Sequence, residues 1–268
     1  MTTMHVFASF GLTVAVVTVF AVTPAQSALF EEDFEALNNF SGLNGQADWT
    51  AGGSTAVVSG PAGSVNTTQV ARQLGSDNSF YTPDPTPTVS GSTLVLEFDV
   101  FFGGDTNDFA YMGLNSGQSA NGPSFGHWTQ NEGWSIRADG FGAFKSAVDA
   151  SGNVITPQTD TWYSVRSVWD LAAANGQGEA TLEIKNLTAG ETEFTTLYFD
   201  EAQTDPTATL EIETDPATFD TVFLRMLGGQ RGDTATFVDN LSVVPEPGTL
   251  SLFIPGSLLL FARRRRSQ

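Results

Sequence analysis

The stretch TLVLEFDVFF, residues Thr93–Phe102, contains the clearest β-strand pattern in the chain. Leu94, Leu96, Phe98 and Val100 occupy every second position, and an acidic residue follows two of them. Because side chains alternate between the two faces of a strand, this spacing gives one uniformly apolar face. The pattern therefore predicts a strand that covers a hydrophobic core on one side.

Other short runs rich in Val, Thr and aromatic residues lie between Gly, Asn, Asp and Pro on both sides of this strand. They are Phe109–Leu114, Gly133–Ala138, Trp162–Asp170, Ala180–Leu187, Phe194–Phe199, Asp220–Leu227 and Thr236–Val244. Several short strands separated by turn residues favour an all-β, two-sheet sandwich over a helical fold. We expect one domain over residues 28–244, a jelly roll, with helix confined to an N-terminal signal and a short C-terminal segment.

The N-terminus has the features of an export signal. Val6–Val22 is almost entirely apolar, and Pro24 then precedes the small residues Ala25 and Ser27. Small residues at these two positions suit signal peptidase, so we expect cleavage after Ser27 and a signal peptide over residues 1–27. The first five residues contain no Lys or Arg, which leaves an uncleaved anchor as the alternative.

The C-terminus, residues 245–268, combines a Pro-Glu-Pro motif, an apolar segment and an arginine cluster. The apolar segment Thr249–Ala262 has 14 residues, about 21 Å as a helix, against roughly 30 Å for the hydrocarbon core of a membrane. Arginines that follow such a segment stay on the cytoplasmic side. We expect transient membrane association through this segment rather than a permanent span.

This tail closely resembles the PEP-CTERM sorting signal of Gram-negative bacteria. The matching motif residues are Pro245, Glu246, Pro247, Arg263, Arg264, Arg265 and Arg266. The resemblance implies that an exosortase cleaves near the motif after export and delivers the protein to the cell surface or extracellular matrix. It also implies an association with exopolysaccharide or biofilm.

The segment between the two ends resembles concanavalin-A-like (LamG or laminarinase-type) jelly-roll domains. The similar stretches are LFEEDFEAL and NGQADWT near the start, WYSVRSVWDLAAANGQGEATLEIKNLTAG, and the closing TFVDNLSVV. The resemblance implies that the last strand returns beside the first. This fold hosts lectins, glycosidases and structural modules, so it does not choose between them.

Composition excludes several classes of site. The chain has no cysteine, and His127 is the one histidine outside the signal. Disulfides, thiolate metal sites and histidine-cluster metal sites are therefore absent. The formal net charge is −19, although the tail contributes four of the eleven basic residues. Such a surface repels nucleic acid and favours cations such as calcium, while an acidic coat for solubility is the simpler interpretation.

The strongest catalytic candidates are Glu211, Glu213 and Asp215. In a strand these acids share one face, as glycoside hydrolysis by paired carboxylates requires. They are similar to the acidic triplet of laminarinase-type glycosidases, but that triplet has Asp in the middle and Glu at both ends. The alternative is a solvent-facing acidic strand, which we favour, so a non-enzymatic protein is expected.

A structural calcium site is a second hypothesis. Glu31, Glu32, Asp33 and Glu35 lie near the mature N-terminus, and Asp239 lies in the last strand. The jelly-roll resemblance implies that one calcium ion holds these two strands together. Exposed acids with no cation are the alternative, and the loop at residues 103–108 is another candidate calcium site.

A sugar-binding platform is the third hypothesis. The Gly- and Asn-rich segment 121–144 contains aromatic and imidazole side chains, which can stack on pyranose rings: Phe125, His127, Trp128, Trp134, Phe141 and Phe144. Packing in the core is the alternative. Trp162 and Trp169 lie in clear strand patterns, and we expect both in the core.

Together these features predict an exported surface or matrix protein, non-enzymatic and associated with exopolysaccharide. A glycan-active hydrolase or lyase of the concanavalin-A-like class and a calcium-stabilised structural module are the alternatives. Expected partners are signal peptidase and exosortase during export and exopolysaccharide afterwards, with no nucleic acid.

Overall fold

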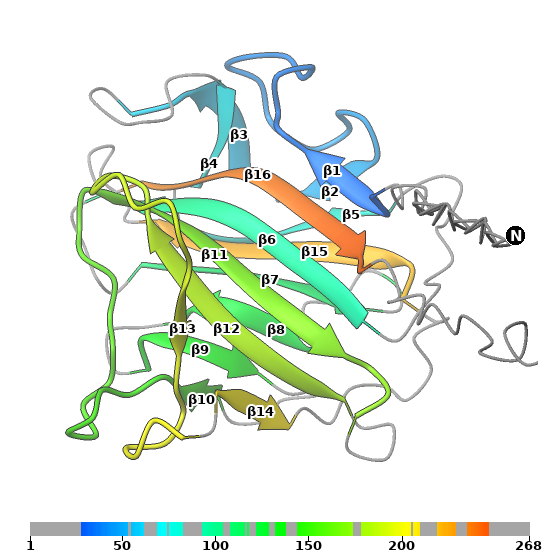
Figure 1. Cartoon of the computed structure of the whole chain (residues 1–268). Helices are drawn as coiled ribbons and strands as arrows, with labels where there is room; N and C mark the ends of the chain where they lie inside the picture. Colours follow the sequence, from blue (N-terminus) through cyan, green and yellow to red (C-terminus); the bar gives the residue numbers. More distant parts are fainter. Residues whose placement is uncertain are drawn as a thin grey trace, which may run out of the picture.

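The computed structural model describes the central part of the chain as an all-β structure (Figure 1). The described residues are 28–52, 55–61, 69–73, 75–82, 93–103, 108–115, 117, 122–128, 132–137, 144–173, 178–204, 206–209, 219–228 and 235–246. These residues form strands, turns and bends and contain no helix. The expected signal and C-terminal helices fall on residues outside this set.

Two antiparallel sheets face each other. In the larger sheet, sheet A, the strand order is β13-β12-β11-β6-β16-β4-β3, with β1 added to β16 and β14 added to β12. Its strands are β1 (Phe30–Glu32), β3 (Thr55–Ser59), β4 (Gln69–Gln73), β6 (Thr93–Phe102), β11 (Thr161–Asp170), β12 (Glu179–Asn186), β13 (Thr195–Leu197), β14 (Thr207–Thr209) and β16 (Thr236–Pro245).

In the second sheet, sheet B, the order is β10-β9-β8-β7-β15-β5-β2. Its strands are β2 (Trp49–Ala51), β5 (Gly75–Tyr81), β7 (Phe109–Asn115), β8 (Ser124–His127), β9 (Trp134–Arg137), β10 (Phe144–Ser146) and β15 (Thr221–Gly228). Figure 1 shows β12, β11, β6 and β16 as one layer and β9, β8, β7 and β15 as the other. The all-β, two-sheet sandwich expected from the sequence is confirmed.

The strand β6 lies at the centre of sheet A and has the predicted bounds. It pairs along its whole length with β11 and, apart from one irregularity, with β16. Leu94, Leu96, Phe98 and Val100 are fully buried and face sheet B. Burying a side chain of this size contributes about 1.5–3 kcal/mol, so the alternation decides which face of the strand meets the core.

The core between the sheets is rich in aromatic side chains. Trp134, Trp169, Phe98, Phe102 and Phe125 are at most 1% exposed and belong to one cluster of buried residues. The expected burial of Trp169 is confirmed. The expected burial of Trp162 is confirmed too, although this residue packs in a separate small cluster with Phe101.

The last strand, β16, contains a bulge that connects the core to the N-terminus. Its register on β6 shifts between Asp239 and Ser242, and Asn240 has a φ of 51°. Asn tolerates this left-handed conformation better than most residues, and a bulge re-aims side chains locally. After the bulge, β1 pairs antiparallel with β16, so that Phe30 lies opposite Val243. The predicted return of the last strand beside the first is confirmed.

Candidate functional site

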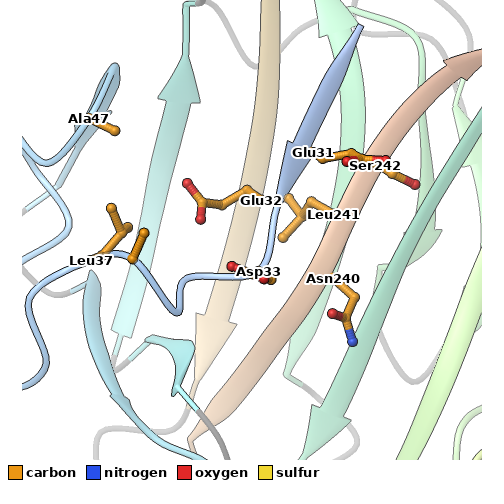
Figure 2. A pocket seen from close by; sticks show the side chains of 9 residues that line it. Glu31, Glu32, Asp33, Leu37, Ala47, Asn240, Leu241 and Ser242 are labelled. Carbon is orange, nitrogen blue, oxygen red and sulfur yellow. The ribbon is translucent and has the colours of Figure 1, made fainter. Parts of the chain in front are cut away.

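A pocket of about 570 Å³ lies where β1 pairs with β16 (Figure 2). This volume is within the range of roughly 300–1,000 Å³ that small-ligand sites occupy. We call this hollow the edge pocket; it is lined by Glu31, Glu32, Asp33, Ala36, Leu37, Ala47, Asn240, Leu241 and Ser242. The sequence-predicted acids of the first strand and the Asp-Asn step of the last strand therefore do lie together.

The edge pocket has a polar strand side and a more apolar loop side. Glu31 lies opposite Ser242 in the strand register, and Figure 2 shows their side chains close together. Leu37 and Ala47 belong to the segment that joins β1 to β2, residues 33–48, which we call the β1–β2 loop. Glu32 extends from β1 toward this loop in the same view. A ligand here would meet carboxylates and a hydroxyl on one side and aliphatic groups on the other.

Hydrogen bonds within the chain already use two of the predicted calcium ligands. Oε1 of Glu32 accepts from the backbone N–H of Phe34 at 2.7 Å, and Oε2 accepts from Nε1 of Trp49 at 3.0 Å. Oε1 of Glu35 accepts from the N–H of Gln69 at 2.7 Å. These bonds fix the start of the β1–β2 loop, and they leave less of either carboxylate for a ligand.

The remaining pocket carboxylates, Glu31 and Asp33, are both exposed. Oδ1 of Asp33 accepts a 3.1 Å bond from the N–H of Glu35. Glu31 makes no side-chain hydrogen bond with the part of the chain that the structure describes. Glu31 and Asp33 are therefore the acids of the edge pocket that a ligand can reach most directly.

Asp239 is the buried member of the predicted acidic set. It is 2% exposed and lies directly opposite Asp99 of the neighbouring strand β6. Burial raises the pKa of Asp239 to about 8, and the nearby negative charges of Asp99, Glu35 and Asp33 add to that rise. Burial also raises the pKa of Asp99, against the lowering effect of a 2.8 Å hydrogen bond from Nδ2 of Asn240.

The fit of this region to a calcium ion is incomplete. Within the described ranges, no three acidic or imidazole side chains lie close enough together to hold a metal ion. Calcium takes six to eight oxygen ligands, and these include backbone carbonyls and water. A cation at Asp33 would therefore need such oxygens in addition to carboxylates.

The predicted sugar platform has a different structure from the one expected. Trp128 and Phe144 lie on the outer face of sheet B, where the indole of Trp128 is stacked between two rings. Its centroid is 4.6 Å from that of Phe109 at 26° and 4.5 Å from that of Phe144 at 18°. Because a pyranose ring stacks on an aromatic face, and both faces of this indole are covered, Trp128 offers a sugar only its edge.

An arginine binds the same cluster together. Nη1 of Arg225 donates a 2.9 Å hydrogen bond to the hydroxyl of Tyr111, and its guanidinium carbon lies 5.5 Å from the Trp128 centroid. Tyr111 is 1% exposed and Phe223, in the same cluster, is fully buried. The outer face of sheet B thus carries a second, smaller core rather than an open platform.

The other platform candidates lie in the main core or outside the described residues. Trp134 and His127 are fully buried and Phe125 is 1% exposed. His127 packs edge-to-face against Phe102 and Trp134, with centroids 5.0 and 5.8 Å away. The prediction that these three side chains form an exposed platform is wrong, because the strand alternation of β8 and β9 turns them inward. Phe141 lies outside the described residues.

The other predicted sites lie only partly within the described residues. Glu211, Glu213 and Asp215 lie outside the described residues, as do Pro247 and Arg263–Arg266. Pro245 is the last residue of β16 and is buried, and the N–H of Glu246 donates a 3.1 Å bond to the carbonyl of Thr93. In the described part of the chain, no helix is long and apolar enough to cross a membrane.

Sequence reasoning missed the loop side of the edge pocket. Leu37 and Ala47 line it, and Phe40 in the same loop is 77% exposed. No spacing rule marks these residues, because the loop has neither strand nor helix periodicity. The one available signal was the amide-rich sequence around Phe40, NNFSGLNGQ.

Solved structures of other proteins resemble this chain only weakly in fold and in sequence. A carbohydrate esterase from the Shiga toxin-encoding bacteriophage phi24B has a TM-score of 0.48 and 13% identity, and the alignment covers 83% of this chain and 100% of that one. The cellulose-induced protein Cip1 has a TM-score of 0.48 and 12% identity, with coverage of 80% and 96%. The carbohydrate recognition domain of Emp47p has a TM-score of 0.46 and 8% identity, with coverage of 84% and 99%.

Similarity at this level carries no conclusion about function. No protein-family model matches the chain, and no curated protein matches its sequence.

Proposed function

We propose that this chain is an exported surface or matrix protein that binds a neutral extracellular polysaccharide at the edge pocket without cleaving it. The observation that supports this is the composition of the pocket. Exposed carboxylates of Glu31 and Asp33, the amide of Asn240 and the hydroxyl of Ser242 line a hollow whose other side is aliphatic. Sugars present both hydroxyl groups and apolar C–H faces, so such a lining suits them.

The charge of the pocket narrows the class of polysaccharide. Carboxylates accept hydrogen bonds from sugar hydroxyls, and bonds to charged groups contribute about 1.5–3 kcal/mol. A polyanion such as a uronic acid polymer would bring like charges together, which is unfavourable at an acidic site. The pocket therefore favours neutral, hydroxyl-rich chains.

Binding can be tested by calorimetry of the purified chain with neutral glucans, mannans and alginate. We expect binding to at least one neutral glycan, and the Glu31→Ala variant should bind it about tenfold more weakly. Glu193→Ala is the matched control, because Glu193 is an exposed acid beside β13, at the opposite end of sheet A. Failure of every neutral glycan to bind would reject the proposal.

Export and sorting are part of the same proposal. The signal at residues 1–27 and the tail at 245–268 support an exported protein that exosortase processes near Pro245–Pro247. Replacing Arg263–Arg266 with alanine in an exosortase-containing host should leave an unprocessed, longer form in the membrane fraction. Normal processing of that variant would contradict the sorting role.

A hydrolase or lyase is the alternative, supported by the spacing of Glu211 and Glu213. It is distinguished by incubating the chain with the same glycans and measuring new reducing ends or unsaturated products. If the chain releases such products and the Glu213→Gln variant does not, the enzyme is favoured.

A calcium-stabilised module stays a separate prediction. Its support is the density of carboxylates around Asp239, including Asp33 and Asp99. An ion that binds only the folded state adds about 2.7 kcal/mol at a hundred times its dissociation constant. We expect millimolar calcium to raise the melting temperature and a chelator to lower it; an unchanged melting temperature would contradict the prediction.

A further inference from the structure

Phe40 is the one large apolar side chain that stands exposed in the part of the chain that the structure describes. It is 77% exposed and lies in the middle of the β1–β2 loop. A single exposed apolar residue is common on protein surfaces and needs no explanation by itself. Its backbone conformation makes this one unusual.

Phe40 has a φ of 60°, in the left-handed region that bulky residues rarely adopt. A residue other than glycine pays about 1–2 kcal/mol there, because Cβ approaches a carbonyl oxygen. Gly or Asn would make the same turn at lower cost. Strain of this kind persists where something offsets it, and such positions gather at binding and active sites.

Phe34, in the same loop, shows how the cost is normally offset. It has a φ of 59°, but its ring is fully buried and lies 6.0 Å from that of Trp49. Packing in the core stabilises Phe34 by more than the strain costs. The ring of Phe40 receives little packing from this chain, so packing does not offset the strain there as it does at Phe34.

The loop holds Phe40 in a fixed position. The N–H of Phe40 donates to the carbonyl of Val57 at 2.8 Å, and the N–H of Val57 donates to the carbonyl of Ser41 at 3.0 Å. Leu43, which is fully buried, donates to the carbonyl of Thr55 at 3.0 Å. These bonds attach the loop to β3, the strand at the end of sheet A. A ring fixed in advance loses less entropy on binding than a mobile one.

Exposed amides flank the ring in the sequence. Oδ1 of Asn39 shares the N–H of Phe40 with the carbonyl of Val57, at 2.9 Å, and Oδ1 of Asn44 accepts the N–H of Ala51 at 3.1 Å. Within the described residues, no acceptor is bonded to the amide nitrogens of Asn39 and Asn44. Fixing the oxygens in this way leaves two N–H₂ groups to donate to a ligand. Neutral amides beside an aromatic ring suit a hydroxyl-rich, uncharged ligand.

We propose that Phe40 stacks on a pyranose ring of the polysaccharide, so that one glycan chain runs from the edge pocket across the β1–β2 loop. The inference rests on the proposed function and adds Phe40 as the residue that contacts the apolar face of the sugar. Leu37 and Ala47 line the pocket and belong to the same loop as Phe40. The ligand class is a neutral polysaccharide whose pyranose rings expose a C–H face, such as a β-linked glucan.

The test measures binding of neutral hexasaccharides to the purified chain and to Phe40→Ala, Phe40→Trp and Phe194→Ala. Phe194 is the matched control, since this partly exposed ring lies beside β13, at the other end of sheet A. We expect Phe40→Ala to bind about tenfold more weakly, and Phe40→Trp and Phe194→Ala to bind like the unaltered chain. Melting temperatures, measured in parallel, should be unchanged in Phe40→Ala, which excludes a loss of folding.

Three results would overturn the inference, and they differ in what they say of the proposed function. If Phe40→Ala binds normally while Glu31→Ala is weakened, the pocket binds glycan without Phe40. If no neutral glycan binds the unaltered chain, the proposed function fails as well. If the chain instead binds zwitterionic phosphatidylcholine vesicles, and Phe40→Ala abolishes that binding, the ring contacts membrane rather than sugar.

Discussion

Two regions of the molecule are rich in aromatic residues but use them in opposite ways. On the outer face of sheet B, the rings of Phe109, Trp128 and Phe144 stack on one another, and Arg225 binds the edge of the cluster. In the β1–β2 loop, Phe40 is exposed and held by backbone bonds, close in sequence to residues that line a polar pocket.

The difference shows that the number of aromatic residues is a poor guide to a binding site. A ring can contact a ligand only through a face that its own chain has not covered. In the sheet B cluster the rings pack against one another, which contributes to stability. In the β1–β2 loop, one ring and several polar groups remain exposed to solvent, so a ligand can reach them.

The two phenylalanines of the loop with a positive φ, Phe34 and Phe40, should differ strongly in their contribution to stability. Phe34→Ala removes a fully buried ring and should lower the free energy of unfolding by about 3–5 kcal/mol. Phe40→Ala should change it by no more than about 1 kcal/mol, because that ring buries little surface. Urea denaturation of both variants measures the difference. Equal losses would mean that Phe40 is a structural residue.

A somewhat smaller effect is expected at Trp128. Trp128→Ala removes the middle ring of the stack and should cost about 2–4 kcal/mol of stability, since each aromatic pair adds about 0.5–1.5 kcal/mol to the burial of surface. Affinity for a neutral glycan should stay the same. If Trp128→Ala folds normally but no longer binds glycan, the sugar site lies on sheet B.

The stability of the chain should also depend on pH through Asp239, which lies beside the edge pocket. Its folded-state pKa of about 8 lies above the value of an unfolded Asp, near 4, so the folded chain binds this proton more tightly. The resulting stabilisation is complete at acidic pH and is lost as pH rises from about 4 to 8. The slope for one group is at most about 1.4 kcal/mol per pH unit.

The matched variant for this titration is Asp239→Asn, which keeps the shape and removes the charge. It should flatten the pH dependence of the unfolding free energy and make the protein more stable than the unaltered chain at pH 8. The groups facing Asp239 are Asp99, Glu35 and Asp33. Parallel pH profiles for the two proteins would contradict a raised pKa.

Much of the sandwich was predictable because its long strands are runs rich in apolar, β-branched and aromatic residues, and β6 and β12 also alternate between buried and partly exposed positions. The strands β6, β7, β11, β12, β15 and β16 match the predicted runs to within one or two residues. The strands β2, β3, β4, β5, β8 and β10 were missed, although β5 has seven residues and β3 and β4 have five each. Pairing with neighbouring strands keeps these segments extended, and the partners lie near in the sequence for β8 and β10 and far away for β5, which pairs with β15.

The candidate site was predictable only in part. The acids near the start of the domain and Asp239 were expected to come together, and the pairing of β1 with β16 brings Asp33 and Glu35 near Asp239, although no three acids of the described residues could hold a metal ion. The bonds of Glu32 to Trp49 and Phe34 depend on tertiary contacts that no spacing reveals. For the same reason, the sequence left Trp134 and His127 open between a sugar platform and the core, and the pairing of β8 with β9 places both in the core.

Glycan is proposed to bind at the β1–β16 edge and its loop rather than on the outer face of sheet B. Hydrogen–deuterium exchange of the purified chain, with and without a saturating neutral hexasaccharide, tests it most directly. We expect slower exchange in residues 31–47 and 240–242 on binding, with no change in 109–115 and 124–128. Protection of the second pair of segments and not the first would contradict it.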